Sequence, residues 1–279
     1  MTESGAQTVE TQDDAWHVPR EFPSLARNEV HVWRIDLPGQ QDDSYEFWLS
    51  PDERTRAAGF RVMHARRWFI VTRAVLRMLL ARYLGTPLED LPLRVNAWGK
   101  PQLVPESTDL HFNVSHTRTC ALIAMTRQRR VGIDVECSRR GLADMQIAEH
   151  FFAPEETAAL RALPAGERAA AFFNCWTRKE AWVKAVGRGL SIPLDAFVVS
   201  IGEAADLLEV RGAAAEAARW TLRALHPDPD HIGALAVEGH GWRLRQWQWP
   251  ATLPHRRHSA HDPLPASLIS RARAATVGS

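Results

Sequence analysis

One stretch of the sequence decides the fold, and it reads Trp176-Thr177-Arg178-Lys179-Glu180-Ala181-Trp182-Val183-Lys184-Ala185-Val186-Gly187-Arg188-Gly189-Leu190. The residues from Phe172 onward are helix formers and aromatics without proline, and Gly187 is the residue type that most easily ends a helix. The sequence therefore predicts a helix over 172–186 with one apolar stripe facing a core. That stripe consists of Phe172, Trp176, Val183 and Val186.

The same helix carries a pair of opposite charges. Glu180 and Lys184 stand four residues apart, which places a carboxylate and an ammonium group on neighbouring turns, just before a Gly-Arg-Gly turn. A solvated ion pair of this kind contributes only about 0.2–0.5 kcal/mol and needs no function. A second acidic cluster upstream favours a functional site instead.

That cluster is Gly132-Ile133-Asp134-Val135-Glu136. Its apolar residues alternate with the others at the period of a strand, so both carboxylates emerge on one face. Like charges at this spacing repel one another unless a cation neutralises them, and Mg²⁺ is commonly held by one or two carboxylates with water and phosphate oxygens. Most D-x-E pairs are only the solvated face of a strand. A third carboxylate, a lysine and a Ser-His pair favour a metal site here.

Composition excludes several classes of function. The 279 residues contain 34 Lys and Arg against 33 Asp and Glu, so the chain has no overall bias toward nucleic acid or membranes. Cys120, Cys137 and Cys175 are odd in number and form no C-x-x-C pair, which argues against a disulfide framework or a zinc site. The first residues carry no export signal and no apolar run approaches a membrane span, so we expect a cytoplasmic protein.

The remaining pattern predicts an α+β fold. A helix is expected from Pro51 to Leu84 with a break at Gly59, and a second from Pro154 to Leu163. Strands are expected over 30–36, 93–97, 110–114, 120–125, 131–136, 196–201, 218–225, 232–237 and 242–249.

These elements divide into two lobes, each with helices packed on mostly antiparallel strands, which meet near Val131. We place a flexible lead at 1–28, the first lobe at 29–130, the second at 131–250 and a flexible tail at 251–279. Because candidate phosphate ligands and acids come from both lobes, the site is expected in the cleft between them.

The first lobe supplies candidate phosphate ligands. Ser115-His116 follows a strand without the glycines of a nucleophile elbow, so these side chains are better suited to donating to phosphate than to serine hydrolysis. The turn Trp98-Gly99-Lys100-Pro101 exposes backbone groups and one ammonium. The helix over 51–84 is rich in arginine, of which one or two could bind phosphate in bidentate fashion.

In order and spacing, the motifs together resemble Sfp-type 4′-phosphopantetheinyl transferases. The resemblance covers about residues 30 to 250 and rests on Trp98–Pro101, Phe112–His116, Gly132–Glu136, Phe151-Phe152 before Glu155-Glu156, and Trp176–Leu190. It implies two α+β lobes related by a pseudo-two-fold axis, with coenzyme A and Mg²⁺ bound in the cleft. It also implies transfer of phosphopantetheine from coenzyme A to a serine hydroxyl of an acyl or peptidyl carrier protein, with release of adenosine 3′,5′-bisphosphate.

The resemblance also implies roles for single residues. Asp134, Glu136 and Glu180 would surround the magnesium ion, and Glu180 would act as base for the carrier serine, directly or through water. Lys184 and the Ser115-His116 pair would contact the phosphates of the coenzyme, so that Asp134, Glu180 and Lys184 form the catalytic set. Gly99, Lys100 and Pro101 would border the adenine and its ribose phosphate.

The match is looser in the early helix. Arg56 fits a cation that grips the 3′-phosphate, while Glu53 stands where another member would carry lysine. The next such cation falls on Arg66 or Arg67, and we take Arg67 as the candidate.

The resemblance further implies a carrier partner that presents a negatively charged helix beside its serine. We expect docking near Gly187-Arg188-Gly189, and a monomer, since two lobes on one chain can complete the site. Fatty-acid, polyketide and nonribosomal peptide carriers all stay open. Two other functions are kept as alternatives: a catalytically silent module that binds coenzyme A or carriers, and a Mg²⁺-dependent phosphohydrolase.

Overall fold

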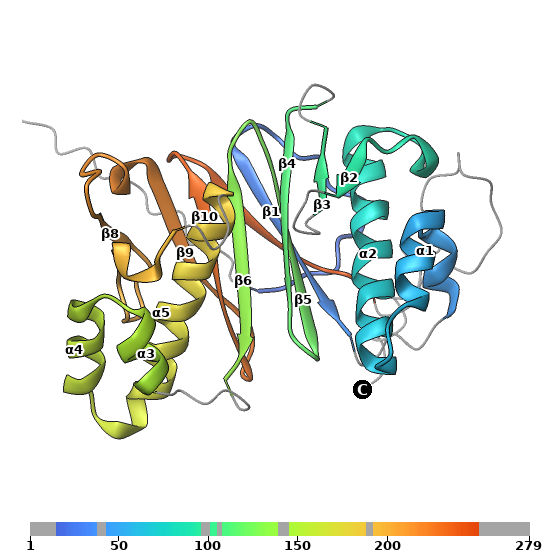
Figure 1. The fold of residues 1–279 in the computed structure, drawn as a ribbon. Helices are drawn as coiled ribbons and strands as arrows, with labels where there is room; N and C mark the ends of the chain where they lie inside the picture. Colours follow the sequence, from blue (N-terminus) through green and yellow to red (C-terminus); the bar gives the residue numbers. More distant parts are fainter. Residues whose placement is uncertain are drawn as a thin grey trace, which may run out of the picture.

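Two β-sheets pack face to face, and one long helix covers the outer side of each (Figure 1). The computed structural model describes residues 15–37, 43–95, 101–104, 108–138, 145–187 and 192–250. The first sheet has the strand order β11-β1-β5-β4 and the second the order β6-β10-β9. The α+β fold class expected from the sequence is confirmed.

The first sheet and its helices occupy the right half of Figure 1. Its strands are β1 (Glu29–Asp36), β4 (Leu110–His116), β5 (Cys120–Arg127) and β11 (Arg243–Gln248). The helix α2 (Met63–Leu84) packs on it and is followed outward by α1 (Pro51–Ala58). Shorter elements of this half are η1 (Asp43–Trp48), η2 (Leu88–Asp90), β2 (Leu93–Val95) and β3 (Pro101–Leu103).

The second sheet consists of β6 (Val131–Cys137), β9 (Trp220–Asp228) and β10 (His231–Glu238). The helix α5 (Ala165–Val186) covers its outer face, with α3 (Met145–Phe151) and α4 (Pro154–Ala162) beyond (Figure 1). The remaining elements are η5 (Leu194–Ala196), β7 (Phe197–Val199), β8 (Leu207–Val210) and η6 (Ala217–Arg219).

Alternation along the strands produces the three apolar layers. In β1, Val30 and Val32 face the second sheet, while Trp33 and Ile35 face α2. In β6, Val131, Ile133 and Val135 likewise point into the layer between the sheets. The other face of β6 therefore turns toward α5, as the period of two requires.

The helix ends follow the glycines. Gly85 and Gly187 adopt left-handed backbone conformations, with φ of 64° and 79°, directly after α2 and α5. Such a conformation carries a steric penalty for residues with a Cβ, so glycine suits both ends. The break expected at Gly59 is also confirmed, because this residue caps the C-terminus of α1.

Several expected boundaries were wrong. The helix expected over 172–186 begins at Ala165, with Pro164 as its N-cap, because proline is compatible with a helix start. The strand expected over 218–225 runs to Asp228 as part of a hairpin with β10. The sequence reading also lacked α3, β3 and β8, which are short.

The last strand returns to the first sheet. β11 pairs in parallel with β1, and Trp247 lies opposite Trp33. Trp33 packs edge-on against Trp249, with ring centroids 5.9 Å apart. Trp247 and Trp249 therefore belong to the core beside α2, while Trp242 packs against the layer between the sheets. No helix within the described residues is long and apolar enough to cross a membrane.

Candidate active site

The edge strands of the two sheets, β4 and β6, lie side by side and form a seam. Asn113 of β4 is buried, and its Oδ1 accepts a hydrogen bond of 2.9 Å from the backbone N–H of Ile133 in β6. Two residues further along, the Ser115 hydroxyl donates to Asp134 Oδ1 at 2.8 Å. The end of β4 is thus held against the acidic face of β6.

Gly132 lets β6 approach α5 closely. A Cβ at this position would lie 2.0 Å from the backbone oxygen of Ala181 and 2.4 Å from the nitrogen of Ala185. Both neighbours are helix backbone and cannot move aside, so only glycine fits. This contact brings Asp134, two residues on, against the side chains of the same helix.

Asp134 connects the two halves of the molecule. Its Oδ1 accepts from the Ser115 hydroxyl of β4, and lies 2.5 Å from the Lys184 ammonium of α5. Lys184 Nζ also donates to Ser115 Oγ at 3.1 Å. Asp134 is 4% exposed, so these charged groups interact in a site with little water.

The other two carboxylates of the predicted metal site lie in the same electrostatic environment. Burial, and next the charge of Asp134, raise the pKa of Glu136 to about 7, although Lys184 and a hydrogen bond from Trp176 oppose the shift. Burial and Asp134 likewise raise the pKa of Glu180, against the effect of Lys184. The charge of Asp134 thus adds to burial in disfavouring the ionised forms of Glu136 and Glu180.

The donor set fits a hard divalent cation. Asp134 Oδ2 is buried and receives no hydrogen bond from the described residues, which leaves a carboxylate oxygen available. Carboxylate oxygens are the ligands that Mg²⁺ prefers, and a cation would relieve the repulsion among the acids. Within the described ranges, however, no three such side chains are already gathered as a closed ligand set.

Comparison with known proteins decides the family. Residues 41–128 match the family described as 4′-phosphopantetheinyl transferase, N-terminal, and residues 130–236 match the 4′-phosphopantetheinyl transferase superfamily. The chain is 35% identical over 232 residues to the 4′-phosphopantetheinyl transferase HetI of Nostoc sp. (strain PCC 7120), covering 81% of this chain and 94% of HetI. This chain belongs to that superfamily.

Two further relatives agree. The transferase is 29% identical over 169 residues to Sfp of Bacillus subtilis (strain 168). This alignment covers 60% of this chain and 74% of Sfp. It is 33% identical over 164 residues to the putative transferase slr0495 of Synechocystis sp. (strain PCC 6803), covering 58% of this chain and 67% of the relative. The protein is a 4′-phosphopantetheinyl transferase, as its motifs indicate.

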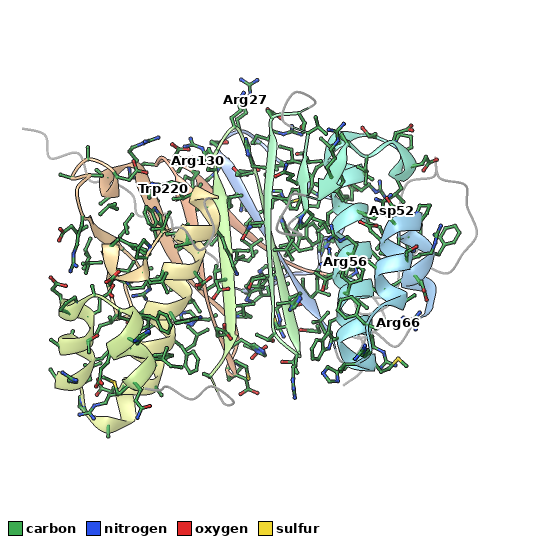
Figure 2. All side chains as sticks on the ribbon, viewed as in Figure 1. Arg27, Asp52, Arg56, Arg66, Arg130 and Trp220 are labelled. Carbon is green, nitrogen blue, oxygen red and sulfur yellow. The ribbon has the colours of Figure 1, made fainter. Side chains whose placement is uncertain are left out.

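The early-helix candidates of the transferase lie apart from these acids. Figure 2 places Arg56 and Arg66 on the helices beyond the first sheet. Arg66 forms an ion pair with Glu46 at 3.0 Å, Arg56 lies over the Phe69 ring at 5.3 Å, and Arg67 is exposed. The assignment of Arg56 and Arg67 to the coenzyme stays a prediction.

Glu53, the departure from the family pattern, has a structural role. Its carboxylate accepts from the backbone N–H of Ser50 at 2.9 Å, and Ser50 Oγ accepts from the Glu53 backbone N–H at 3.2 Å, which completes a capping box. Glu53 also lies 3.5 Å from Arg73 and 3.6 Å from Arg77, both buried. A lysine here would lose the cap and face two cations.

The other sequence candidates have mixed outcomes. Pro101 opens β3 and His116 is the exposed last residue of β4. Gly99, Lys100 and Arg188 lie outside the described residues.

Sequence reasoning missed two residues of the site. Asn113 was assigned only to a motif, yet polar residues at 113 and 115 in one strand could have indicated a face that bonds to a neighbour. Trp176 belongs to the predicted apolar stripe, although its side chain also acts to lower the pKa of Glu136. No pattern in the sequence indicates this second effect.

Proposed function

We propose that the protein transfers 4′-phosphopantetheine from coenzyme A to a serine hydroxyl of an apo acyl or peptidyl carrier protein, with Mg²⁺, and releases adenosine 3′,5′-bisphosphate. The observation that carries this proposal is the buried Asp134, which joins Lys184 of α5 to Ser115 of β4. Acidic and basic groups of the second half meet a hydroxyl group of the first half there, an arrangement suited to phosphate chemistry.

Glu180 is the proposed base. A serine hydroxyl is a poor nucleophile at neutral pH, and a carboxylate with a raised pKa accepts its proton more readily. Glu180 takes this proton, directly or through one water, while the serine oxygen forms a bond to the β-phosphorus. The bond from that phosphorus to the bridging oxygen breaks, and adenosine 3′,5′-bisphosphate leaves with the electron pair.

Lys184, Ser115 and His116 bind the phosphates. The Lys184 ammonium and the Ser115 hydroxyl already lie 3.1 Å apart, so both can donate to one group of phosphate oxygens. Asp134, Glu136 and Glu180 would hold Mg²⁺, which neutralises charge that develops on the phosphate oxygens. Asp134 also orients Lys184 and Ser115, because one carboxylate oxygen contacts both.

The finer architecture belongs to the same proposal. Two lobes, 29–130 and 131–250, related by a pseudo-two-fold axis, would place the coenzyme in their cleft. In support, α2 and α5 are both 22-residue helices that lie on one sheet each and end at a left-handed glycine. Arg56, Arg67, Gly99, Lys100 and Pro101 would contact the 3′-phosphoadenosine, a carrier helix would dock near Arg188, and the protein would act as a monomer.

The intact mass of a purified apo carrier protein, incubated with this protein, coenzyme A and Mg²⁺, tests the proposal. We expect a phosphopantetheine-sized increase that vanishes with EDTA and in Glu180→Gln. No increase across fatty-acid, polyketide and nonribosomal peptide carriers, with coenzyme A still bound, would favour the silent binding module. Release of adenosine bisphosphate without any carrier would favour the phosphohydrolase.

A further inference from the structure

Three alternate residues at the end of β4 cross the seam between the sheets. Asn113 bonds to the Ile133 backbone and Ser115 to Asp134, as described above. Two residues further, the Thr117 hydroxyl lies 3.0 Å from His231 Nε2 at the start of β10. Because alternate residues of an extended chain share one face, β4 and the residue just after it contact the second sheet three times from the same face.

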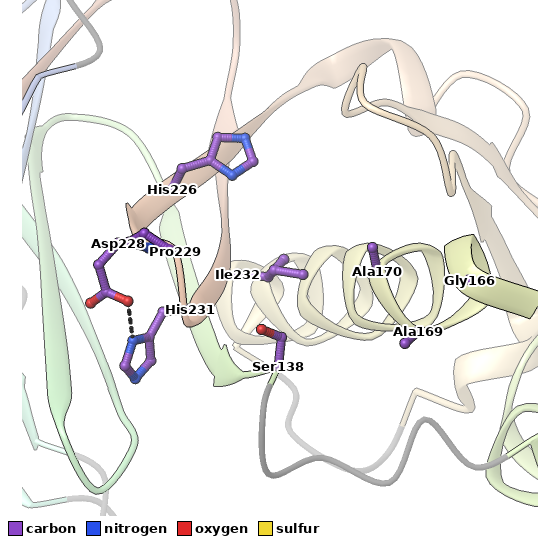
Figure 3. A pocket seen from close by; sticks show the side chains of 9 residues that line it. All are labelled: Ser138, Gly166, Ala169, Ala170, His226, Asp228, Pro229, His231 and Ile232. Atoms are coloured by element: carbon purple, nitrogen blue, oxygen red, sulfur yellow. Dashed lines mark hydrogen bonds and ion pairs between the residues drawn. The ribbon is translucent and has the colours of Figure 1, made fainter.

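His231 is the centre of the third contact. It is 5% exposed, and its Nε2 also lies 2.9 Å from the Thr119 hydroxyl. On the other side of the ring, Nδ1 lies 2.8 Å from Asp228 Oδ1 (Figure 3). We call these four residues the latch: His231 and Asp228 from the second sheet, with Thr117 and Thr119 from the turn after β4.

The hydrogen-bond network assigns the atoms of the latch. A carboxylate only accepts, so Nδ1 carries the proton that is donated to Asp228, and Nε2 faces the two threonine hydroxyls. Asp228 is fixed in turn by the backbone N–H of Asp230 at 2.8 Å and by Arg34 of β1 at 3.4 Å. The bond from Nδ1 to this fixed carboxylate therefore holds the His231 ring in one orientation.

Thr117 passes this restraint to the end of β4. Its hydroxyl oxygen accepts from the backbone N–H groups of Thr119 and Cys120, at 3.2 and 3.1 Å, and thereby shapes the turn into β5. Ser115 is two residues before Thr117 and His116 is adjacent to it. A shift of Thr117 would therefore move both side chains that face the phosphates.

We propose that His231 is a positioning residue of the transferase, which holds Thr117 and Thr119 so that Ser115 and His116 stay in place beside Asp134 and Lys184. This inference rests on the proposed role of Ser115 in binding the coenzyme phosphates. The packing of the two sheets has its own apolar contacts apart from the latch, because buried residues of both sheets, such as Val32, Leu122 and Ile133, form one cluster between them. The latch sets where the end of β4 lies, and adjoins a pocket of about 700 Å³ lined by Ser138 and by α5.

The test compares His231→Phe with two other variants. Phenylalanine keeps the ring and removes both nitrogens, so we expect KM for coenzyme A to rise about tenfold, the effect of losing roughly one hydrogen bond to an oriented group, with kcat changed less. His231→Gln keeps an acceptor within reach of the hydroxyls and should recover part of the loss. The matched control is His240→Phe in the turn after β10, at the opposite end of that strand from His231, where the ring bonds to Thr221 Oγ1 and to the Ala218 backbone.

A double-variant cycle with Ser115→Ala shows whether the effect passes through Ser115. If it does, His231→Phe raises KM for coenzyme A in the wild type but adds little in the Ser115→Ala background. Equal effects in both backgrounds, or an unchanged KM in His231→Phe, would overturn the inference. If Ser115→Ala itself leaves KM and coenzyme A binding by calorimetry unchanged, the proposed phosphate role of Ser115 fails and the inference with it.

A second variant, which leaves His231 unchanged, tests the inference if His231→Phe folds poorly. Thr117→Val with Thr119→Val removes both hydroxyls and keeps the histidine and its aspartate. We expect the same rise in KM for coenzyme A, with a far-ultraviolet circular dichroism spectrum like that of the wild type. A normal KM in this folded double variant would contradict the latch.

Discussion

At the scale of single residues, the site contains buried charges that a sequence optimised for folding stability alone would lack. Asp134 has a buried oxygen that no described residue satisfies, and burial, followed by the charge of Asp134, raises the pKa of both Glu136 and Glu180. Buried like charges oppose folding unless they are neutralised. A bound cation would therefore stabilise the arrangement, and under the proposed mechanism the residues that serve activity here oppose stability.

The variant Glu136→Gln tests whether this residue lowers folding stability while it serves activity. Removing one of the repelling charges should raise the free energy of unfolding in EDTA by on the order of 1 kcal/mol, while carrier modification falls. Added Mg²⁺ should raise the melting temperature of the wild type, because it binds only the folded site, and should raise that of the variant less. Calorimetric melting with and without Mg²⁺ measures both effects. Glu209→Gln, at an exposed glutamate of β8, is the control, and an equal gain in that variant would argue against repulsion at the site.

At the scale of elements, the register of α5 depends on two buried cations that the sequence did not single out. Lys179 is 0% exposed and lies 2.8 Å from Glu156 Oε2, and it donates to the backbone oxygens of Leu194 and Phe197. Its neighbour Arg178 donates to the backbone oxygens of Ser200 and Gly202. These bonds fix the rotation of α5, so that the adjacent Glu180, and Lys184 one turn later, are held on the side of the helix near Asp134.

The sequence could predict the helix and its functional face, because spacing and the terminal glycine are local signals. It could not predict that Lys179 is buried, since its partners Glu156 and Phe197 lie 23 and 18 residues away in the sequence. Local sequence patterns likewise do not indicate that Asp134 lies beside Lys184, 50 residues away. Only the resemblance to the family implies that these two residues share a site. The start of α5 at Ala165 differs from the expected one because Pro164, a residue typical of a break between helices, is the N-cap here.

Lys179→Met should lower the free energy of unfolding by roughly 3 kcal/mol, because it leaves Glu156 buried without its cation. The double variant Lys179→Met with Glu156→Gln should recover part of this loss, since the remaining amide is neutral. Urea unfolding followed by tryptophan fluorescence measures each difference. The control is Arg211→Met, which breaks the exposed ion pair with Glu155 at 2.9 Å and should cost less than about 1 kcal/mol. Similar losses in Lys179→Met and Arg211→Met would contradict the structural role of Lys179.

At the scale of the whole molecule, the first and last strands close the fold together. β1 and β11 pair in parallel at the edge of the first sheet, a contact between residues more than two hundred apart that no local pattern predicts. His31 lies at this junction, 1% exposed, with Nδ1 at 2.7 Å from the Tyr83 hydroxyl of α2 and its ring edge-on to Trp247. His31, a residue of β1, therefore contacts both α2 and β11, so its environment depends on how these three elements pack.

Closure at His31 should make the whole molecule sensitive to acid. Burial lowers the pKa of His31 from 6.5 to about 4, although Glu29 opposes the shift. As the pH falls from 6.5 to 4, the unfolded chain binds the proton while the folded chain does not, so protonation favours unfolding. The stability that depends on neutral His31 is thus complete above pH 6.5 and declines by on the order of 3 kcal/mol toward pH 4.

The difference between the wild type and His31→Gln isolates this contribution from the carboxylates, which titrate in both proteins. Glutamine keeps a polar group near Tyr83 but does not titrate, so the variant should be less stable than the wild type at pH 7.5, and the gap should narrow as the pH approaches 4. Urea unfolding at steps between these pH values measures the gap, with His226→Gln, at an exposed position of β9, as the control. A gap that stays constant from pH 7.5 to 4 would mean that His31 binds its proton equally well in the folded and unfolded chains, and that the junction of β1, α2 and β11 admits water.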